Sequence, residues 1–219
     1  MFPEAIIFDL DGTLIDNNAY HIEAFKAFYD KIGKQFSVEE YKQHINGRMN
    51  REIFDYVFNT KLTPEQSEAY TNEKEELYRE LYAAHIEPIK GLINFLNELE
   101  SAEIPKAIAT SGIVPNINFM FEHVPIRDYF LNVIDSTQIT HGKPHPEIFL
   151  KAVASVNATP AHCIAFEDSM AGIRSAKAAG LKVVALTTTH VAEDLQQADL
   201  IIKDYTEISL TQLRQLGNN

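Results

Sequence analysis

Short apolar segments alternate with helical stretches over most of the chain after residue 88, and this alternation restricts the fold more than any other feature. The apolar segments lie at residues 106–110, 131–135, 162–166, 182–186 and 199–202. Between them are stretches with helical periodicity, such as residues 146–156 and 169–180. Strands that alternate with helices form a parallel sheet covered on both faces, so the sequence predicts an α/β fold with a doubly wound parallel sheet.

The long segment between residues 16 and 85 has helical periodicity and no convincing strand. Two helix starts are indicated by capping-box patterns, Ser37 with Glu40 and Thr63 with Gln66. We therefore expect an all-helical cap at residues 16–86, inserted into a Rossmann-like core. That core would consist of residues 1–15 and 87–219.

The stretch DLDGT at residues 9–13 directly follows a short apolar strand. Asp9 and Asp11 then lie at the end of this strand, and Gly12 permits a tight turn. The two acids are either solvated turn residues or a pair with a chemical role. A calcium-binding loop is excluded, because its sixth and twelfth positions counted from Asp9 hold Leu14 and Tyr20 instead of Gly and Glu.

The carboxyl ends of parallel strands meet at one edge of the sheet, where such folds bind ligands. Besides Asp9 and Asp11, this edge is expected to carry Thr110, Ser111, Gly112, Lys143, Glu167, Asp168 and Ser169. Several carboxylates at one edge require a cation, and Mg²⁺ prefers oxygen ligands, so we expect Asp9, Asp11 and Asp168 to bind Mg²⁺. The expected donors to a phosphoryl group are Thr110, Lys143 and backbone N–H groups of the Asp9 loop.

Two acids two residues apart can divide the work of phosphoryl transfer. One aspartate attacks phosphorus, and the second protonates the leaving oxygen and later activates water. We assign the first task to Asp9, which ends the strand, and the second to Asp11.

Four motifs in this order resemble those of the haloacid dehalogenase superfamily of phosphotransferases. They are DLDGT at residues 9–13, Thr110 in IATSG, Lys143 in GKPHPEIF, and FEDSMAGIRSAKAAG at residues 166–180. With a helical cap inserted after the first strand, the chain looks most similar to the β-phosphoglucomutase-like group. The resemblance implies Mg²⁺-dependent phosphoryl transfer through a phosphorylated Asp9. It also implies that Glu167, Asp168 and the backbone carbonyl of Asp11 complete the metal site.

Substrate specificity is expected on the cap. His21, Arg51 and Lys74 resemble cap residues of the mutases, and Arg48 or Arg51 is expected to face the cleft. Each also has a plain structural interpretation. His21 could be a packed residue beside aromatic side chains, the arginines could bind surface carboxylates, and Lys74 could belong to an exposed, ion-paired helix face.

His141 and His145 have the spacing of zinc ligands, but Gly142 and Pro144 argue against a helix that would align them. They are less promising candidates than the residues above.

The shared motifs leave the acceptor of the phosphoryl group open. We favour water, and thus a phosphatase of a small phosphorylated metabolite such as a sugar phosphate, with β-phosphoglucomutase as the alternative. A phosphoacceptor module resembling a response-regulator receiver is a more distant alternative, because such modules lack a helical insertion after the first strand.

The formal net charge of −12 over 219 residues argues against nucleic acid and anionic membranes as partners. The single cysteine, Cys163, excludes an internal disulfide and fits a reducing compartment. No signal peptide or membrane span is apparent, so we expect a cytoplasmic protein. The resemblance implies a monomer.

Overall fold

The structure is a computed structural model that describes residues 3–217. Its centre is a six-stranded parallel sheet in the order β3-β2-β1-β4-β5-β6. The strands are β1 (Ala5–Phe8), β2 (Lys106–Ala109), β3 (Asn132–Ile134), β4 (Cys163–Glu167), β5 (Lys182–Leu186) and β6 (Leu200–Ile202). The predicted doubly wound sheet is confirmed, and each strand lies within the expected segment or one residue beyond it.

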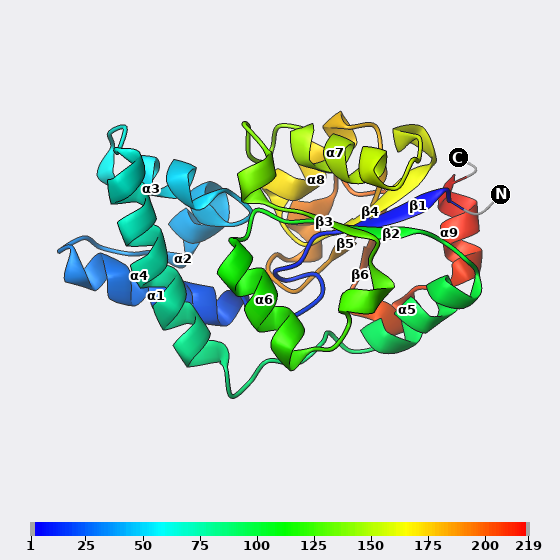
Figure 1. Cartoon of the computed structure of the whole chain (residues 1–219), viewed down its shortest axis with the longest axis horizontal. Coiled ribbons are helices and arrows are strands. Elements are labelled where there is room, and N and C mark those ends of the chain that lie inside the picture. Colours follow the sequence, from blue (N-terminus) through cyan, green and yellow to red (C-terminus); the bar gives the residue numbers. More distant parts are fainter. Residues whose placement is uncertain (1–2, 218–219) are drawn as a thin grey trace.

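Helices cover both faces of this sheet (Figure 1). One face is covered by α7 (Glu147–Ser155) and α8 (Met170–Ala178), and the other by α5 (Leu92–Ser101), α6 (Val114–His123) and α9 (Leu210–Gly217). Single-turn 3₁₀ segments are η2 (Arg127–Tyr129), η3 (Ser136–Gln138), η4 (Pro160–His162), η5 (Ala192–Leu195) and η6 (Tyr205–Glu207).

The central strand β1 contributes to a hydrophobic cluster on each side of the sheet. Ala5 and Ile7 pack with the residues of α7 and α8, whereas Ile6 and Phe8 pack with those of α5, α6 and α9. All four side chains are fully buried, because successive residues of a strand point to opposite faces. Burial on both faces explains why β1 reads as a continuous apolar run.

The predicted helical insertion is confirmed and forms a separate bundle beside the sheet (Figure 1). It contains α1 (Asn18–Lys31), α2 (Val38–Glu40), the π-helical turn η1 (Tyr41–Ile45), α3 (Asn50–Phe58) and α4 (Pro64–Tyr82). The bundle has a hydrophobic cluster of its own, in which Phe25, Phe28 and Phe54 are buried. We call this bundle the cap.

Local capping determines where two cap helices begin. Thr63 and Gln66 form a complete capping box at the start of α4, as predicted. The Ser37 side chain accepts a hydrogen bond from Glu40 N, but α2 gives way to the π-helical turn after three residues. The entry and exit of the cap lie side by side, since Ile89 N donates to Leu14 O at 2.9 Å.

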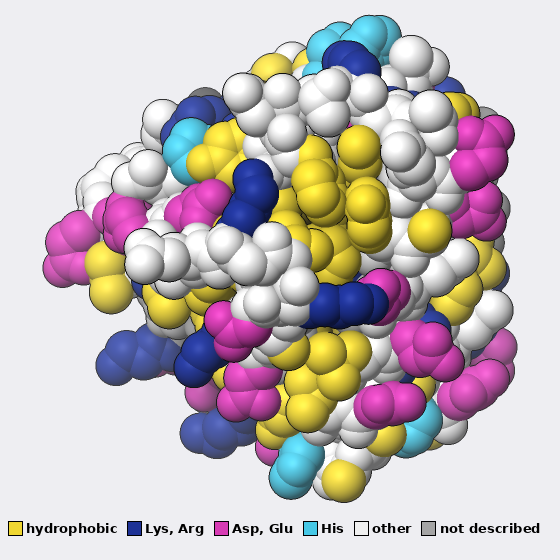
Figure 2. Space-filling view, turned by 90° about the vertical axis from the view of Figure 1, so that its left-hand side faces the viewer, with side chains coloured by type: hydrophobic (Ala, Val, Ile, Leu, Met, Phe, Trp, Pro, Cys, Tyr) yellow, Lys and Arg dark blue, Asp and Glu magenta, His cyan; other side chains and the backbone are white. Residues whose placement is uncertain are grey.

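The outer surface of the cap end carries charges of both signs. Figure 2 shows hydrophobic side chains gathered in the middle of this face, with Lys, Arg, Asp and Glu side chains around them. The net charge of −12 is therefore not collected in one acidic patch on this face. Within residues 3–217, the helices are too short or too polar to span a bilayer.

Candidate active site

Asp9 follows the last residue of β1 and is held there by a buried lysine. The backbone N–H of Asp9 donates to Phe166 O of the neighbouring strand at 2.9 Å, which fixes the end of the strand. Lys143 Nζ donates to Asp9 Oδ1 and to Glu167 Oε1, both at 2.6 Å. Its side chain is 1% exposed. Burial opposes the charged ammonium, but the two carboxylates outweigh it and raise the pKa of Lys143 above its ordinary value.

Three buried carboxylates, from Asp9, Glu167 and Asp168, lie close enough together to bind one metal ion. One oxygen from each lies within 4.8 Å of the others. Burial raises the pKa of Asp9 and of Asp168 well above the ordinary range, and the neighbouring carboxylates add to the effect. The single lysine that contacts Asp9 and Glu167 leaves an excess of negative charge, and an all-oxygen set of this kind fits Mg²⁺.

The polypeptide comes unusually close to two of these carboxylates. A Cβ atom on Gly12 would lie 2.2 Å from Asp168 Oδ2, and one on Gly172 would lie 1.6 Å from Glu167 Oε1. Glu167 Oε2 also accepts hydrogen bonds from Asp168 N and Ser169 N, at 2.8 and 2.7 Å. Glycine in the DLDGT and FEDSMAGIRSAKAAG motifs therefore makes room for the acidic group.

Asp11 lies at the entrance to the cap, and Asn17 holds its carboxylate. Asn17 Nδ2 donates to Asp11 Oδ1 at 2.5 Å, while Asn17 Oδ1 accepts from Gly12 N at 3.0 Å. Asn17 is fully buried. One side chain thus fixes both the turn and the acid that the turn presents.

A row of buried polar groups leads from Asp11 into the cap. His21 Nε2 lies 3.7 Å from Asp11 Oδ1, Lys74 Nζ lies 3.1 Å from His21 Nδ1, and Lys74 Nζ donates to Glu75 Oε1 at 2.8 Å. The alternative that Lys74 lies on an exposed helix face is wrong, because its side chain is only 2% exposed.

The carboxylate of Glu75 is held by three side chains. Besides Lys74, it accepts hydrogen bonds from Asn50 Nδ2 and Asn116 Nδ2, both at 2.8 Å. Burial by itself would raise the pKa of Glu75, but the Lys74 ammonium outweighs it and the pKa falls to about 2. Asn116 belongs to α6 of the core, so this contact joins the core to the cap.

Most of the sequence-predicted residues meet at one cleft between the cap and the sheet edge. Those that line it are Asp9, Asp11, His21, Arg48, Lys74, Thr110, Ser111, Gly112 and Asp168. Lys143 and Glu167 lie against Asp9. Ser111 Oγ donates to Gly47 O of the cap at 2.9 Å, and Gly112 N donates to Thr110 Oγ1 at 3.0 Å.

The two cap arginines differ in position. Arg48 lines the cleft, whereas Arg51 donates from Nη2 to Thr140 O in the core loop before α7. Arg51 lines a separate groove between the cap and the core. The structure therefore brings Arg48, and not Arg51, to the predicted site.

Sequence reasoning missed several polar residues of the site, among them Asn17, Asn18, Glu75 and Asn116. Asn18 Nδ2 donates to Asp168 Oδ2 at 3.3 Å, and Asn18 Oδ1 accepts from Tyr41 OH at 2.9 Å. A pair of asparagines directly before a helical insertion is a weak signal, because asparagine is common at helix starts. Glu75 and Asn116 lie in ordinary helical sequence and carry no local signal.

Comparison with known proteins decides the family. The sequence matches the model of the haloacid dehalogenase-like hydrolase family over residues 6–186. The chain is a haloacid dehalogenase-like hydrolase. Its similarity to β-phosphoglucomutase, described below, assigns it to the β-phosphoglucomutase-like group of this superfamily and confirms the resemblance inferred from the motifs.

Two relatives resemble this hydrolase over nearly its full length. Validoxylamine A 7′-phosphate phosphatase of Streptomyces hygroscopicus subsp. limoneus is 30% identical over 92% of the chain and 94% of that protein. β-Phosphoglucomutase of Bacillus subtilis is 28% identical over 97% of the chain and 94% of that protein. Among solved structures, a HAD hydrolase of family IA, variant 3, from Entamoeba histolytica superposes with a TM-score of 0.88. It is 31% identical, and the match covers 99% of this chain and 100% of the other.

Proposed function

We propose that this hydrolase is a Mg²⁺-dependent phosphatase that removes the phosphoryl group from a small, polar phosphate monoester. The observation that carries the proposal is the position of Asp9, bonded to Lys143 at 2.6 Å beside Glu167 and Asp168. A phosphatase of a phosphorylated small molecule is also among its similar relatives. A helical insertion after β1 leaves no support for the receiver-like alternative.

In the proposed reaction, a carboxylate oxygen of Asp9 attacks phosphorus and the bond from phosphorus to the ester oxygen breaks. Asp11 gives its proton to the leaving oxygen, and the product alcohol departs. Asp11 then takes a proton from a water molecule that attacks the phosphorylated Asp9, which releases inorganic phosphate and restores both acids.

The surrounding residues bind and neutralise the phosphoryl group. Lys143 offsets the charge on Asp9 and keeps the nucleophile in place, while Thr110 lines the cleft as a hydroxyl donor. Asp9, Glu167 and Asp168, with the backbone carbonyl of Asp11, would hold Mg²⁺. The bound ion would screen the anionic phosphate from the carboxylates.

The lining of the cleft favours a polar substrate. Four asparagines line it, Asn18, Asn46, Asn50 and Asn116. Arg48 adds a cation on the cap side, whereas the charge of Lys74 is balanced by Glu75 at 2.8 Å. Amides that donate and accept suit the hydroxyl groups of a sugar or another polyol.

β-Phosphoglucomutase activity is the second candidate, supported by His21 and Lys74 in the cleft and by the relative of that name. Phosphate release from a panel of sugar phosphates with Mg²⁺ should be measured beside a coupled assay for conversion of β-glucose 1-phosphate to glucose 6-phosphate. We expect release that exceeds isomerisation for the preferred substrate. Isomerisation with little release would contradict the phosphatase assignment and support the mutase.

We further propose that residues 16–86 move as one unit relative to a core of residues 1–15 and 87–219. The connections near Asp16 and at residues 84–88 would serve as hinges. Contacts such as Ser111 Oγ to Gly47 O at 2.9 Å and Gly142 N to Glu52 Oε1 at 3.3 Å correspond to a closed cleft. Solution scattering should give a larger radius of gyration without ligand than with Mg²⁺ and a phosphate mimic. An unchanged radius would contradict this motion.

A further inference from the structure

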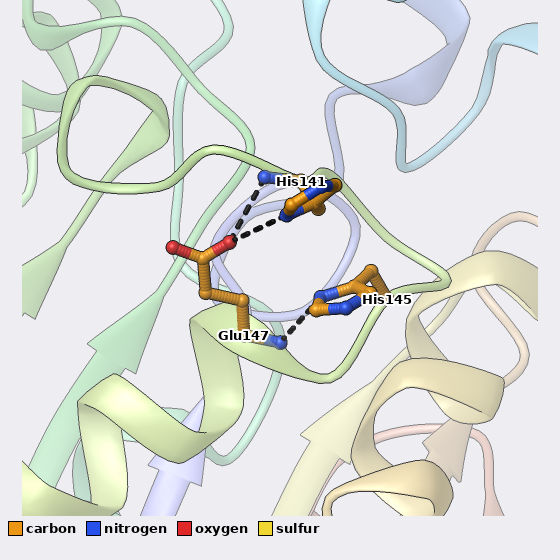
Figure 3. Close-up of side chains that lie close together, drawn as sticks. All are labelled: His141, His145 and Glu147. Carbon is orange, nitrogen blue, oxygen red and sulfur yellow. Dashed lines mark hydrogen bonds and ion pairs between the residues drawn. The ribbon is translucent and has the colours of Figure 1, made fainter.

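Outside the proposed active site, two histidines and a glutamate gather on the loop that carries Lys143. His141, His145 and Glu147 come from residues 141–147, where the loop runs into the first turn of α7 (Figure 3). Both imidazole rings are exposed, and Glu147 is 17% exposed. No helix aligns the two histidines, as the sequence had indicated, but the bend of the loop brings them together.

The distances among these side chains approach those of a three-residue metal site. His141 Nδ1 lies 3.2 Å from Glu147 Oε2, and one ligand atom from each of the three residues lies within 4.8 Å of the others. Ligands about 2.0–2.2 Å from a tetrahedral Zn²⁺ ion lie roughly 3.4 Å apart. His141 and Glu147 already have this spacing, so binding requires the exposed His145 ring to turn out of its contact with Glu147 N, which lies 3.3 Å from His145 Nδ1 (Figure 3).

Glu147 is held in the orientation that a metal ion would need. Its Oε1 pairs with Lys151 Nζ at 3.1 Å. Its Oε2 accepts from His141 N at 2.9 Å and faces the His141 ring (Figure 3). Thr140 N donates to both oxygens at 3.1 Å, so the backbone of the loop fixes the carboxylate, and Oε2 is the oxygen that faces the His141 ring.

We propose that His141, His145 and Glu147 form a binding site for a divalent transition metal of the Zn²⁺ type. Two imidazoles and one carboxylate bind Zn²⁺ in preference to Mg²⁺. Water would occupy the fourth coordination position. The site differs in ligand chemistry from the all-carboxylate group of Asp9, Glu167 and Asp168. Zn²⁺ and Mg²⁺ would therefore bind at separate sites.

A metal ion at this position would stabilise a loop that also contacts Asp9 and the cap. Lys143 lies between the two histidines in sequence and reaches Asp9. The cap contacts the same loop, since Arg51 donates to Thr140 O and Gly142 N donates to Glu52 Oε1 at 3.3 Å. Bound metal is therefore expected to raise the unfolding temperature of the protein.

The test is calorimetric titration of the full chain with Zn²⁺ in the presence of saturating Mg²⁺, without substrate. We expect one equivalent of Zn²⁺ to bind, and at least a tenfold loss of affinity in His141→Ala and in His145→Ala. His162→Ala is the matched control, because His162 is an exposed histidine paired with a single glutamate, Glu4, at 2.7 Å, and should leave the affinity unchanged.

Three results would overturn the site: wild-type protein that binds no Zn²⁺, histidine variants that bind it as tightly as wild type, or binding that is lost in Asp168→Asn instead. Melting curves give an independent readout, with a Zn²⁺-dependent rise expected in wild type and in His162→Ala but absent from His145→Ala. None of these measurements depends on phosphatase activity, so the two proposals fail or stand separately.

Discussion

Lys143 Nζ lies 2.6 Å from Asp9 Oδ1, although the two residues are 134 positions apart in the chain. The contact joins the end of β1 to the loop before α7, and both side chains are buried. The Asp9 carboxylate lies beside those of Glu167 and Asp168. The positive charge of Lys143 offsets their mutual repulsion and allows Asp9 to stay close to Glu167. The same contact prepares Asp9 for the role of nucleophile that we propose.

Replacing Asp9 with asparagine should abolish turnover, because an amide is a poor nucleophile toward phosphorus. We expect kcat to fall by at least about a thousand-fold. Steady-state phosphate release would measure the loss, and the melting temperature and circular dichroism would verify that the variant is folded. A folded variant with substantial activity would remove Asp9 from the nucleophile role.

Asn17→Ala should slow the reaction while leaving the metal requirement unchanged. The variant loses the hydrogen bond to Asp11 Oδ1, and a bond to a charged group contributes about 1.5–3 kcal/mol, or roughly ten- to a hundred-fold in kcat. Asn97→Ala, on an exposed face of α5, is the control. Equal kcat values for the two variants would show that Asn17 does not position the acid.

Gly172→Ala should weaken Mg²⁺ activation, since the new methyl group would lie 1.6 Å from Glu167 Oε1 and displace that side chain. Changes around metal ligands typically cost about ten- to a hundred-fold in affinity. Activity titrated against Mg²⁺ would reveal the shift. Gly217→Ala, where nothing lies within 4 Å of the added atom, should behave like wild type. A normal Mg²⁺ titration of Gly172→Ala would place the metal away from Glu167.

The buried Glu75 should make stability depend on pH in acid. Its pKa falls from 4.5 to about 2 on folding, so its contribution is complete above pH 4.5 and is lost as the pH falls toward 2. The difference corresponds to about 3 kcal/mol.

Urea unfolding of wild type and Glu75→Gln should therefore differ by an amount of this order at pH 7, and the difference should disappear as the pH falls through 2. Glu73→Gln is the matched control on the same helix. Glu73 pairs with Lys31 at the surface, and an exposed pair contributes about 0–1 kcal/mol. A gap between wild type and Glu75→Gln that stays constant with pH would contradict the assigned pKa.

Local sequence signals were sufficient for the elements of the fold and for much of the site. Apolar strands and helical periodicity are short-range properties, and parallel strands bring their carboxyl ends to one edge. Asp9, Thr110, Glu167 and Asp168 can therefore be grouped from the sequence alone. Lys143 could be grouped with them too, because the loop that carries it follows the carboxyl end of the third strand.

The sequence by itself determined the alternation of strands and helices, the helical insertion and the acidic residues at the strand ends. Only the tertiary structure decided the strand order, the burial of Lys74 with Glu75, and the choice of Arg48 over Arg51 for the cleft. The physical reason is that a polar side chain on a helix looks the same in sequence whether it faces water or a buried partner. Its environment depends on how the cap packs against the core, which no local pattern encodes.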